Sequence, residues 1–304
     1  MDSCGTHAIS EGSPDLSPTV VVTGATGFVG TALLDRLRVN HSDARVIALS
    51  SARPTGLDLS AHGADEELAR RVSVETPRDA VLIHLAAEVD FVSASAAAKN
   101  IAMALNVATW ARNVGIGFAT LASSVSVYAE APTTTTGSAC SPSSPYGIGK
   151  LVAEDVWKAL LEPRQQAIVR LAGVWGLQAR PTLFWNKLLL AAARGSRGEP
   201  PLVLARRRSG RNYIAVADAA RCLLEVALHR QSGVFIAAGP ETVNTGEFVD
   251  ALAMLPGSRL TIEDSDDGGF DEMLFQPTGA LLSLLTPFDQ ALNDVWSHRP
   301  RWGQ

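Results

Sequence analysis

The chain is poor in cysteine, lysine and tyrosine, and it carries no excess of positive charge. Its three cysteines, Cys4, Cys140 and Cys222, are odd in number and far apart, so they form neither a disulfide framework nor a zinc-binding spacing and suit a reducing, cytoplasmic compartment. Only four of the 26 basic residues are lysines, and the net charge is -5. A nucleic-acid partner is therefore not expected, because phosphate binding needs a basic surface.

Long apolar runs are also missing. No stretch approaches the roughly 18 apolar residues of a membrane-spanning helix, and the first 18 residues lack the basic start and apolar centre of a signal peptide. We therefore expect no membrane partner. Hydrophobic residues still make up 46% of the 304 positions, which is enough for a large core and excludes disorder over most of the chain.

Apolar runs that suit buried strands alternate with segments of helical spacing over the first 172 residues. The expected strands cover 19–22, 45–49, 80–85, 117–123 and 166–171, the expected helices cover 28–38, 65–71, 96–113 and 146–161, and a loop is expected at 133–144. This order is typical of a doubly wound parallel sheet, an α/β Rossmann fold that binds ligands at the carboxyl ends of its strands.

Beyond residue 172 the alternation fades, apart from one more expected strand at 234–237. We therefore predict a flexible tail at 1–18 and a Rossmann domain at 19–172 plus about 211–238. Residues 173–210 plus 239–304 are expected to form a smaller C-terminal lobe that binds the substrate.

The segment TGATGFVG at 23–30 directly follows the first expected strand and opens the first expected helix. Glycines allow the tight turn and the close approach of the backbone to a pyrophosphate, which then sits at the positive end of the helix. A plain strand–helix turn without a ligand is the alternative. The position at the head of an alternating chain favours dinucleotide binding.

The segment YGIGK places Tyr146 and Lys150 four residues apart, on one face of an expected helix. Three tyrosines and four lysines placed at random would give this spacing only about 0.04 times. A tyrosine with a pKa near 10 transfers protons poorly at neutral pH, and a neighbouring ammonium would lower that pKa. A surface pair is the alternative to this acid–base role.

With these two motifs the chain resembles the extended short-chain dehydrogenase/reductases, in the epimerase/dehydratase branch that modifies nucleotide sugars, over about residues 19–295. Further matching segments are HLAAEVD at 84–90, which lines the cofactor in that family, Leu57-Asp58-Leu59, which holds the adenine, the helix carrying Asn100, SSVSVY at 123–128 and RNYIAVAD at 211–218.

The resemblance implies a catalytic triad of Ser124, Tyr146 and Lys150, with no metal. Ser124 would bind the reacting oxygen, although Ser123 and Ser126 are its neighbours, and Arg211 would contact the diphosphate of a nucleotide sugar. His84 is expected to pack beside the cofactor rather than to catalyse. The implied cofactor contacts are Gly24, Thr26, Gly27, Phe28, Val29, Ser50, Arg53, Asp58, Leu59, Leu85, Ala86, Ala87, Asn100, Tyr146 and Lys150.

The choice of cofactor depends on the end of the second expected strand. An acid about 20 residues past the glycines would grip the ribose hydroxyls of NAD. That position holds Ser50, followed by Ser51, and no acid occurs before Asp58. Arg53 would pair with a 2′-phosphate or is a solvated loop charge, so the sequence favours NADP over NAD.

Two departures from the family narrow the reaction. Dehydratases carry acidic residues after the catalytic hydroxyl, where this chain has Val125 and Ser126, so dehydration is disfavoured. The family's usual asparagine in the segment LAGVWG is Gly173, which indicates an unusual substrate.

We therefore predict an NAD(P)-dependent ketoreductase acting on a nucleotide-linked deoxysugar. A nucleotide-sugar epimerase with the same triad and a non-catalytic NAD(P)-sensing regulator are the alternatives, and a small ketone without a nucleotide stays open as substrate. The basic run at 206–208 is either a solvated loop or an anion-binding patch. A homodimer is one open oligomeric state.

Overall fold

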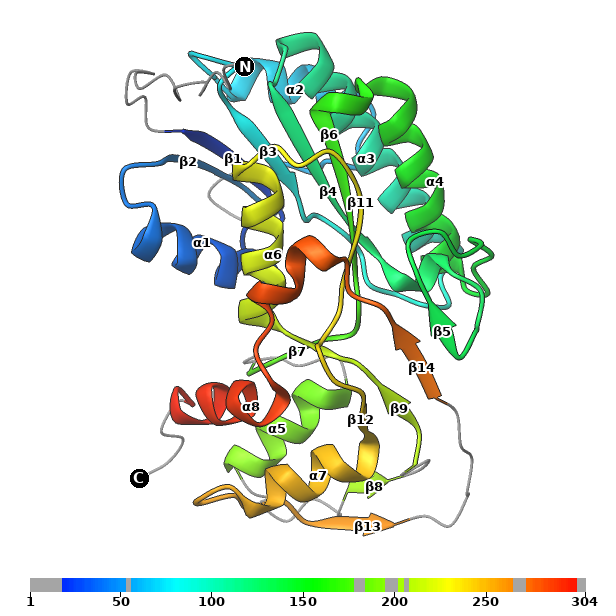
Figure 1. Ribbon diagram of the computed structural model, residues 1–304. Helices are drawn as coiled ribbons and strands as arrows, with labels where there is room; N and C mark the ends of the chain where they lie inside the picture. Colours follow the sequence, from blue (N-terminus) through cyan, green and yellow to red (C-terminus); the bar gives the residue numbers. More distant parts are fainter. Residues whose placement is uncertain are drawn as a thin grey trace, which may run out of the picture.

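The computed structural model describes residues 18–52, 56–177, 184–194, 202–204, 208–264 and 272–299. Six strands form the central sheet in the order β11-β6-β4-β3-β1-β2, and every neighbouring pair is parallel (Figure 1). The strands are β1 (Thr19–Thr23), β2 (Arg45–Leu49), β3 (Val81–His84), β4 (Phe118–Ser124), β6 (Gln166–Leu171) and β11 (Gly233–Ala237).

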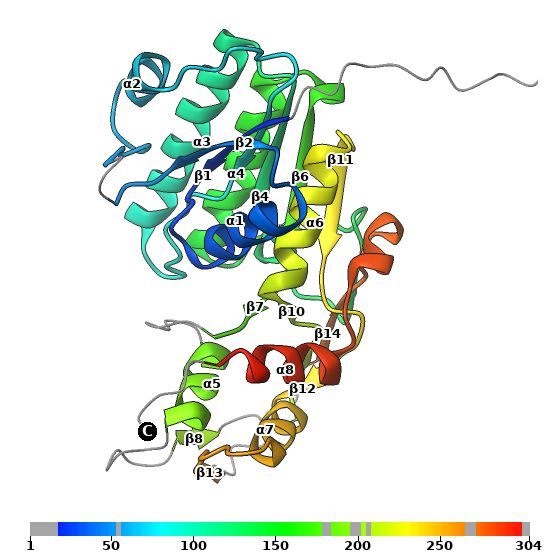
Figure 2. The ribbon, with the colours of Figure 1, turned by 90° about the vertical axis from the view of Figure 1, so that its left-hand side faces the viewer.

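Helices cover both faces of this sheet (Figures 1 and 2). On one face α1 (Phe28–Asn40) packs against α6 (Val216–Leu228); on the other lie α2 (Ala64–Arg71), α3 (Ala94–Val114) and α4 (Pro145–Leu160). Strand residues alternate between two cores, so that Val20 and Val22 pack with α1 and α6 while Val21 packs with α2 and α3. The predicted doubly wound α/β fold is confirmed.

The helix that carries the Tyr/Lys pair has well-defined ends. The Ser144 side chain accepts a hydrogen bond from the Gly147 N–H, and Pro145 occupies the first turn, where its missing N–H costs nothing. Helix α4 therefore begins one residue before Tyr146, and Tyr146 and Lys150 both lie in its first two turns.

A smaller lobe lies beyond the carboxyl ends of the strands (Figure 2). It contains α5 (Phe184–Arg194), α7 (Thr245–Met254) and α8 (Phe288–Ser297), with the short strands β7 (Val174–Trp175), β8 (Leu202–Leu204), β9 (Gly210–Arg211), β10 (Ile214–Ala215), β12 (Val243–Asn244) and β13 (Ile262–Asp264). Its own core contains several aromatic side chains, in which Phe248 makes an edge contact with Trp175 and a tilted contact with Trp185.

The chain returns to the larger lobe after this excursion. Strand β14 (Glu272–Phe275) pairs with β5 (Thr133–Thr134), so the segment expected to be a loop contains a two-residue strand. Phe275 at the end of β14 and Leu281 in the 3-10 helix η3 (Gly279–Leu284) join the core beneath α1 and α6. The predicted division into two lobes stays a prediction. The predicted smaller lobe, which includes 239–304, contains β14 and η3, although these elements pack on the larger lobe.

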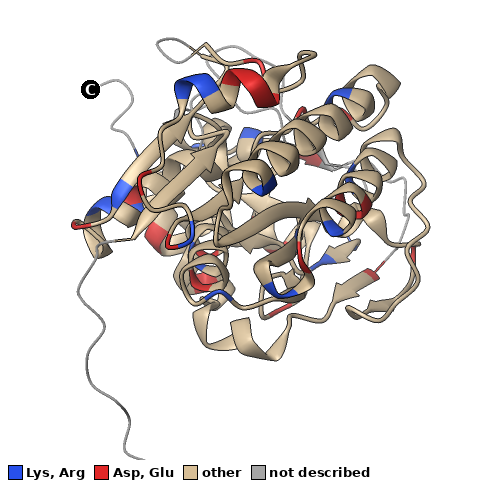
Figure 3. Ribbon diagram, turned by 90° about the horizontal axis from the view of Figure 1, so that it is seen from above, with Lys and Arg blue, Asp and Glu red and all other residues tan. Residues whose placement is uncertain are grey.

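Several predicted features lie outside the described residues: the tail up to residue 17, Arg53, Arg206 and Arg207. Among the described residues no helix is both long and apolar enough to cross a membrane. Basic and acidic positions are interspersed over the outer helices and loops in the view of Figure 3.

Candidate active site

The glycine loop lies against the backbone that follows β3. Gly24 has φ +67°, and a Cβ atom there would stand 2.6 Å from the Ala86 nitrogen, so only glycine fits. Helix α1 begins at Phe28, its N-cap residue Gly27 provides no side-chain cap, and its first turn contains no acidic residue. Its first backbone N–H groups are thus left for an anion, which fits a dinucleotide pyrophosphate.

A cavity of about 360 Å³ opens at the carboxyl ends of β1, β3, β4 and β6. None of the described residues that line it carries a carboxylate. The lining comprises Gly24, Gly27, Phe28, Val29, Gly30, Leu85, Ala87, Val89, Phe91, residues 122–126, Tyr146, Lys150 and residues 171–174. Glycine, apolar side chains and a few hydroxyls suit a nicotinamide dinucleotide.

Asn100 acts on this cavity through the backbone of the loop beside it. Its Oδ1 accepts a hydrogen bond from the Glu88 N–H at 2.8 Å, and its Nδ2 donates to the Glu88 carbonyl at 2.9 Å. Asn100 is buried and does not line the cavity. It positions the loop that supplies Leu85, Ala87 and Phe91.

The end of β2 is tied to the glycine loop. The Ser50 hydroxyl lies 2.7 Å from the Thr26 hydroxyl and accepts the Ala52 N–H at 2.9 Å. Asp58 is exposed, and its carboxylate accepts two hydrogen bonds from Ser60, which lower its pKa. Leu59 is buried in the core, so its side chain contributes packing there.

The structure brings Ser124, Tyr146 and Lys150 together in the first cavity. The Lys150 ammonium donates to the Ala122 carbonyl at 3.0 Å and lies 6.0 Å from the centre of the Tyr146 ring. The Ser124 hydroxyl donates to the Ser126 hydroxyl at 3.1 Å. The Ser124 hydroxyl also affects the ionisation of the Tyr146 phenol.

Burial dominates the ionisation of the triad. It raises the pKa of Tyr146 to about 12, and the hydrogen bond with Ser124 only partly opposes this. It lowers the pKa of Lys150 to about 8, against the opposing charge of Glu154. The pKa of Tyr146 is therefore shifted upward and not downward as the sequence led us to expect, because desolvation of the phenolate dominates, with the Lys150 ammonium 6.0 Å from the ring centre.

His84 packs behind the cavity rather than in it. Its Nδ1 lies 2.6 Å from the Thr23 hydroxyl, and its ring stacks on Trp157. Burial, and then the nearby charge of Lys150, lower its pKa to about 3, so the imidazole is neutral. It has the packed position that the sequence predicts.

A second cavity of about 400 Å³ adjoins the first. Phe91, Val125, Ser126, Ala172 and Gly173 line both. The rest of its wall comes from Tyr128, Glu130, Ser143, Ser144, Arg211, Asn212, Tyr213, Met273 and Phe275. The predicted substrate contact Arg211 thus lines a cavity that adjoins the one holding the triad and is large enough for a small molecule.

Several lining residues were not predicted. The Phe91 ring is tilted against Tyr146 at 4.9 Å, and Ser126 bonds to Ser124. Phe91 directly follows the segment at 84–90, so its place beside the cavity could have been predicted from the sequence. Met273 and Phe275 follow no motif and reach the cavity through the pairing of β14 with β5 on one side and with β9 on the other.

The model of the NAD dependent epimerase/dehydratase family matches residues 20–246. The chain belongs to this family. A Methanocaldococcus jannaschii protein provisionally named UDP-glucose 4-epimerase is 24% identical over 263 residues, which cover 79% of this chain and 83% of that protein.

Two solved structures extend the comparison. MoeE5 in complex with UDP-glucose and NAD aligns with a TM-score of 0.74 at 25% identity, over 92% of this chain and 97% of that one. The dTDP-4-dehydrorhamnose reductase of Bacillus anthracis, in complex with NADP, aligns with a TM-score of 0.75 at 18% identity, over 93% and 100%. The predicted family is confirmed, as is a nicotinamide dinucleotide cofactor at the level of NAD or NADP.

Proposed function

We propose that this protein is an NAD(P)-dependent ketoreductase that acts on a nucleotide-linked deoxysugar. The observation that carries the proposal is the meeting of Ser124, Tyr146 and Lys150 in one cavity, next to a second cavity that contains Arg211. The first space suits the dinucleotide, and the second suits the substrate.

The triad residues divide the proton chemistry. Ser124 hydrogen-bonds the carbonyl oxygen of the substrate, and Tyr146, which stays protonated at neutral pH because of its raised pKa, donates a proton to that oxygen. Lys150 binds the ribose of the cofactor and is charged below about pH 8. The nicotinamide, when bound, supplies the hydride.

The composition of the second cavity supports a nucleotide-sugar substrate. The guanidinium of Arg211 suits a diphosphate, because its planar fork matches phosphate oxygens. Phe91, Met273 and Phe275 provide an apolar wall for a deoxysugar. MoeE5, the solved relative at 25% identity, binds UDP-glucose.

Epimerisation is the second candidate, and the name of the M. jannaschii relative favours it. An epimerase would use the same three side chains, so their positions do not separate the two reactions. Val125 and Ser126 line both cavities where a dehydratase would need an acid, which disfavours dehydration. A regulator that only senses the cofactor would not need the assembled triad.

The deciding experiment follows the cofactor. The purified protein is mixed with NADPH or NADH and a 4-keto-6-deoxy nucleotide sugar, and nucleotide oxidation is compared with alcohol formation. A reductase consumes one reduced nucleotide per alcohol, with NADPH preferred because no acid follows β2 before Asp58. Product without net oxidation and a cofactor retained through purification would identify an epimerase. Binding without either would identify a regulator.

A further inference from the structure

Glu154 is a fully buried carboxylate one helical turn beyond Lys150 on α4. Its Oε1 accepts hydrogen bonds from the Ser123 hydroxyl at 2.6 Å and from Arg170 Nε at 2.9 Å. Its Oε2 accepts one from Arg170 Nη2 at 2.6 Å, with Lys158 at 3.6 Å on the surface side. Both oxygens are therefore committed, and the charge is paired with an arginine that is itself buried.

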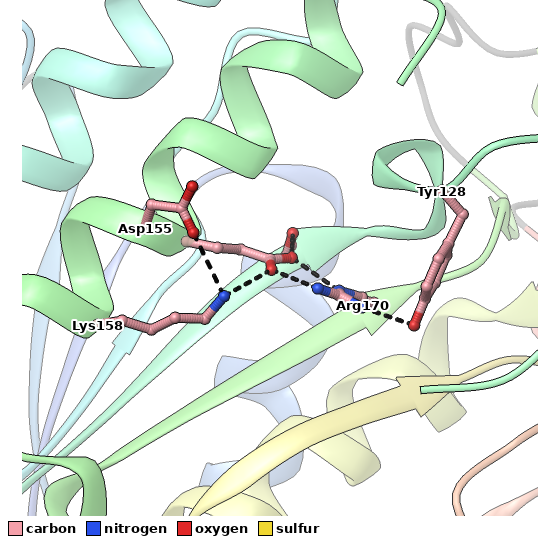
Figure 4. Close-up of polar contacts among 6 residues, drawn as sticks. Tyr128, Asp155, Lys158 and Arg170 are labelled. Carbon is pink, nitrogen blue, oxygen red and sulfur yellow. Dashed lines mark hydrogen bonds and ion pairs between the residues drawn. The ribbon is translucent and has the colours of Figure 1, made fainter. Parts of the chain in front are cut away.

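Arg170, on β6, extends this network to the wall of the second cavity. Its Nη1 donates to the Tyr128 hydroxyl at 2.7 Å, and its guanidinium lies 4.6 Å from the centre of the Tyr128 ring. Figure 4 shows the connected contacts, from Asp155 and Lys158 at one end to Arg170 and Tyr128 at the other. Tyr128 caps the short helix η1 (Val125–Val127) and lines the second cavity.

The elements joined by this carboxylate are those that carry the reacting groups. Ser123 precedes Ser124 at the end of β4, and α4 carries Tyr146 and Lys150. A second close contact occurs at the same junction, because a Cβ atom on Gly147 would overlap the Ser126 carbonyl. A buried ion pair contributes little to stability, because the cost of desolvating its charges offsets their attraction. A role other than stability is therefore a reasonable explanation for the Glu154–Arg170 pair.

We propose that Glu154 is a positioning residue, which fixes α4 to the end of β4 and to Tyr128 and thereby sets Tyr146 against Ser124. This inference rests on the proposed function, since it assumes that the triad reacts. The titratable groups facing Lys150 are Glu154 and Tyr146 on α4 and His84 on β3. The charge of Glu154 raises the Lys150 pKa that burial lowers, so it also favours the charged ammonium.

The main test is Glu154→Gln, which keeps the shape and removes the charge. We expect kcat to fall by about 10- to 100-fold, as for a misplaced acid–base group, with the KM for NADPH changed far less. Asp155→Asn is the matched control, because Asp155 is the next residue, is exposed and also contacts Lys158. It should stay within about twofold of the wild type.

The pH titration of Lys150, followed by NMR, measures the influence of Glu154 on this lysine independently of turnover. With lysine-selective ¹³C labelling, the four lysines give four signals, and the one absent in Lys150→Arg belongs to Lys150. In Glu154→Gln this lysine should titrate at lower pH than in the wild type, and in Asp155→Asn it should not move. This shift reports the charge of Glu154 at Lys150, and the fall in kcat with a nearly unchanged KM for NADPH in the folded variant reports the positioning, which a merely structural role would not produce.

Ser123→Ala covers the case in which Glu154→Gln does not fold. It removes the link to β4 and leaves the Glu154–Arg170 pair in place, and kcat should fall by about 3- to 10-fold, the effect of one lost hydrogen bond. Wild-type kcat in this variant, or a folded Glu154→Gln with unchanged kcat and lysine titration, would overturn the positioning role. A wild-type protein that turns over no nucleotide sugar would instead refute the proposed function.

Discussion

The two cavities of the site differ in which parts of the chain supply their lining residues. Apart from Tyr146 and Lys150 on α4, the first is lined by residues at the carboxyl ends of central strands or just beyond them, within 24–30, 85–91, 122–126 and 171–174. The second takes its wall from residues as far apart as Phe91, Ser143, Arg211 and Phe275. The cofactor side is thus fixed by the sheet itself, and the substrate side by how connecting segments and the smaller lobe fold over it.

This difference predicts that a substitution outside the triad will impair either cofactor binding or substrate binding, but not both. The largest expected effect is that of Tyr146→Phe, which removes the proton donor that both substrate and cofactor meet. Turnover should fall by about 10²-fold or more, the range for a lost acid–base group, while NADPH still binds. Steady-state kinetics and fluorescence titration measure the two quantities. Near-normal turnover would remove Tyr146 from the reaction.

Arg211→Ala should weaken binding of the nucleotide sugar and leave cofactor binding unchanged. Loss of a charge-assisted contact of about 1.5–3 kcal/mol corresponds to a KM for the nucleotide sugar raised roughly 10- to 100-fold. The KM for NADPH should not change, and neither should that for a small ketone without a diphosphate. Arg208→Ala, an exposed arginine three residues earlier, is the control. If both ketones suffer equally, Arg211 is structural.

Gly24→Ala should weaken NADPH binding and leave substrate binding unchanged. The added Cβ would stand 2.6 Å from a backbone atom at φ +67°, and such strain of about 1–3 kcal/mol would weaken NADPH binding roughly 5- to 100-fold. Gly137→Ala is a suitable control, since its Cβ would meet nothing nearer than 3.8 Å. Calorimetric titration of both variants with NADPH measures the effect, and equal affinities would argue against a close pyrophosphate.

Gly173→Ala should give the smallest effect, at the junction of the two cavities. Its Cβ would stand 2.7 Å from the Tyr213 ring, a side chain that can shift, so we expect the KM for the sugar to rise only about 3- to 10-fold. Adding Tyr213→Ala removes the clash and should make the alanine at 173 harmless relative to Tyr213→Ala alone. Additive effects of the two substitutions would show that the residues do not interact.

The same contrast explains what could be predicted from the sequence. The strand ends, the glycine loop and the Tyr146/Lys150 pair follow local patterns of period and spacing, and the structure places them where those patterns indicate. Asn100 carries no sign in the sequence that it works through the Glu88 backbone, and the direction of the Tyr146 pKa depends on a burial that spacing does not reveal. Phe275 reaches the substrate side through a pairing with residues about 140 positions away.

The return of the chain to the larger lobe has a consequence for unfolding. Phe275 and Leu281 complete a core to which strands of the central sheet and helices α1 and α6 contribute, and Thr286 donates two hydrogen bonds to the buried Asp218 of α6. Strand β14 also pairs with β9 of the smaller lobe and with β5 of the larger one, so unfolding of either lobe removes strand pairing from the segment that packs on the other. Heat or denaturant should melt the whole molecule in a single cooperative transition, and cleavage of the chain before β14 should leave no half that is stable alone.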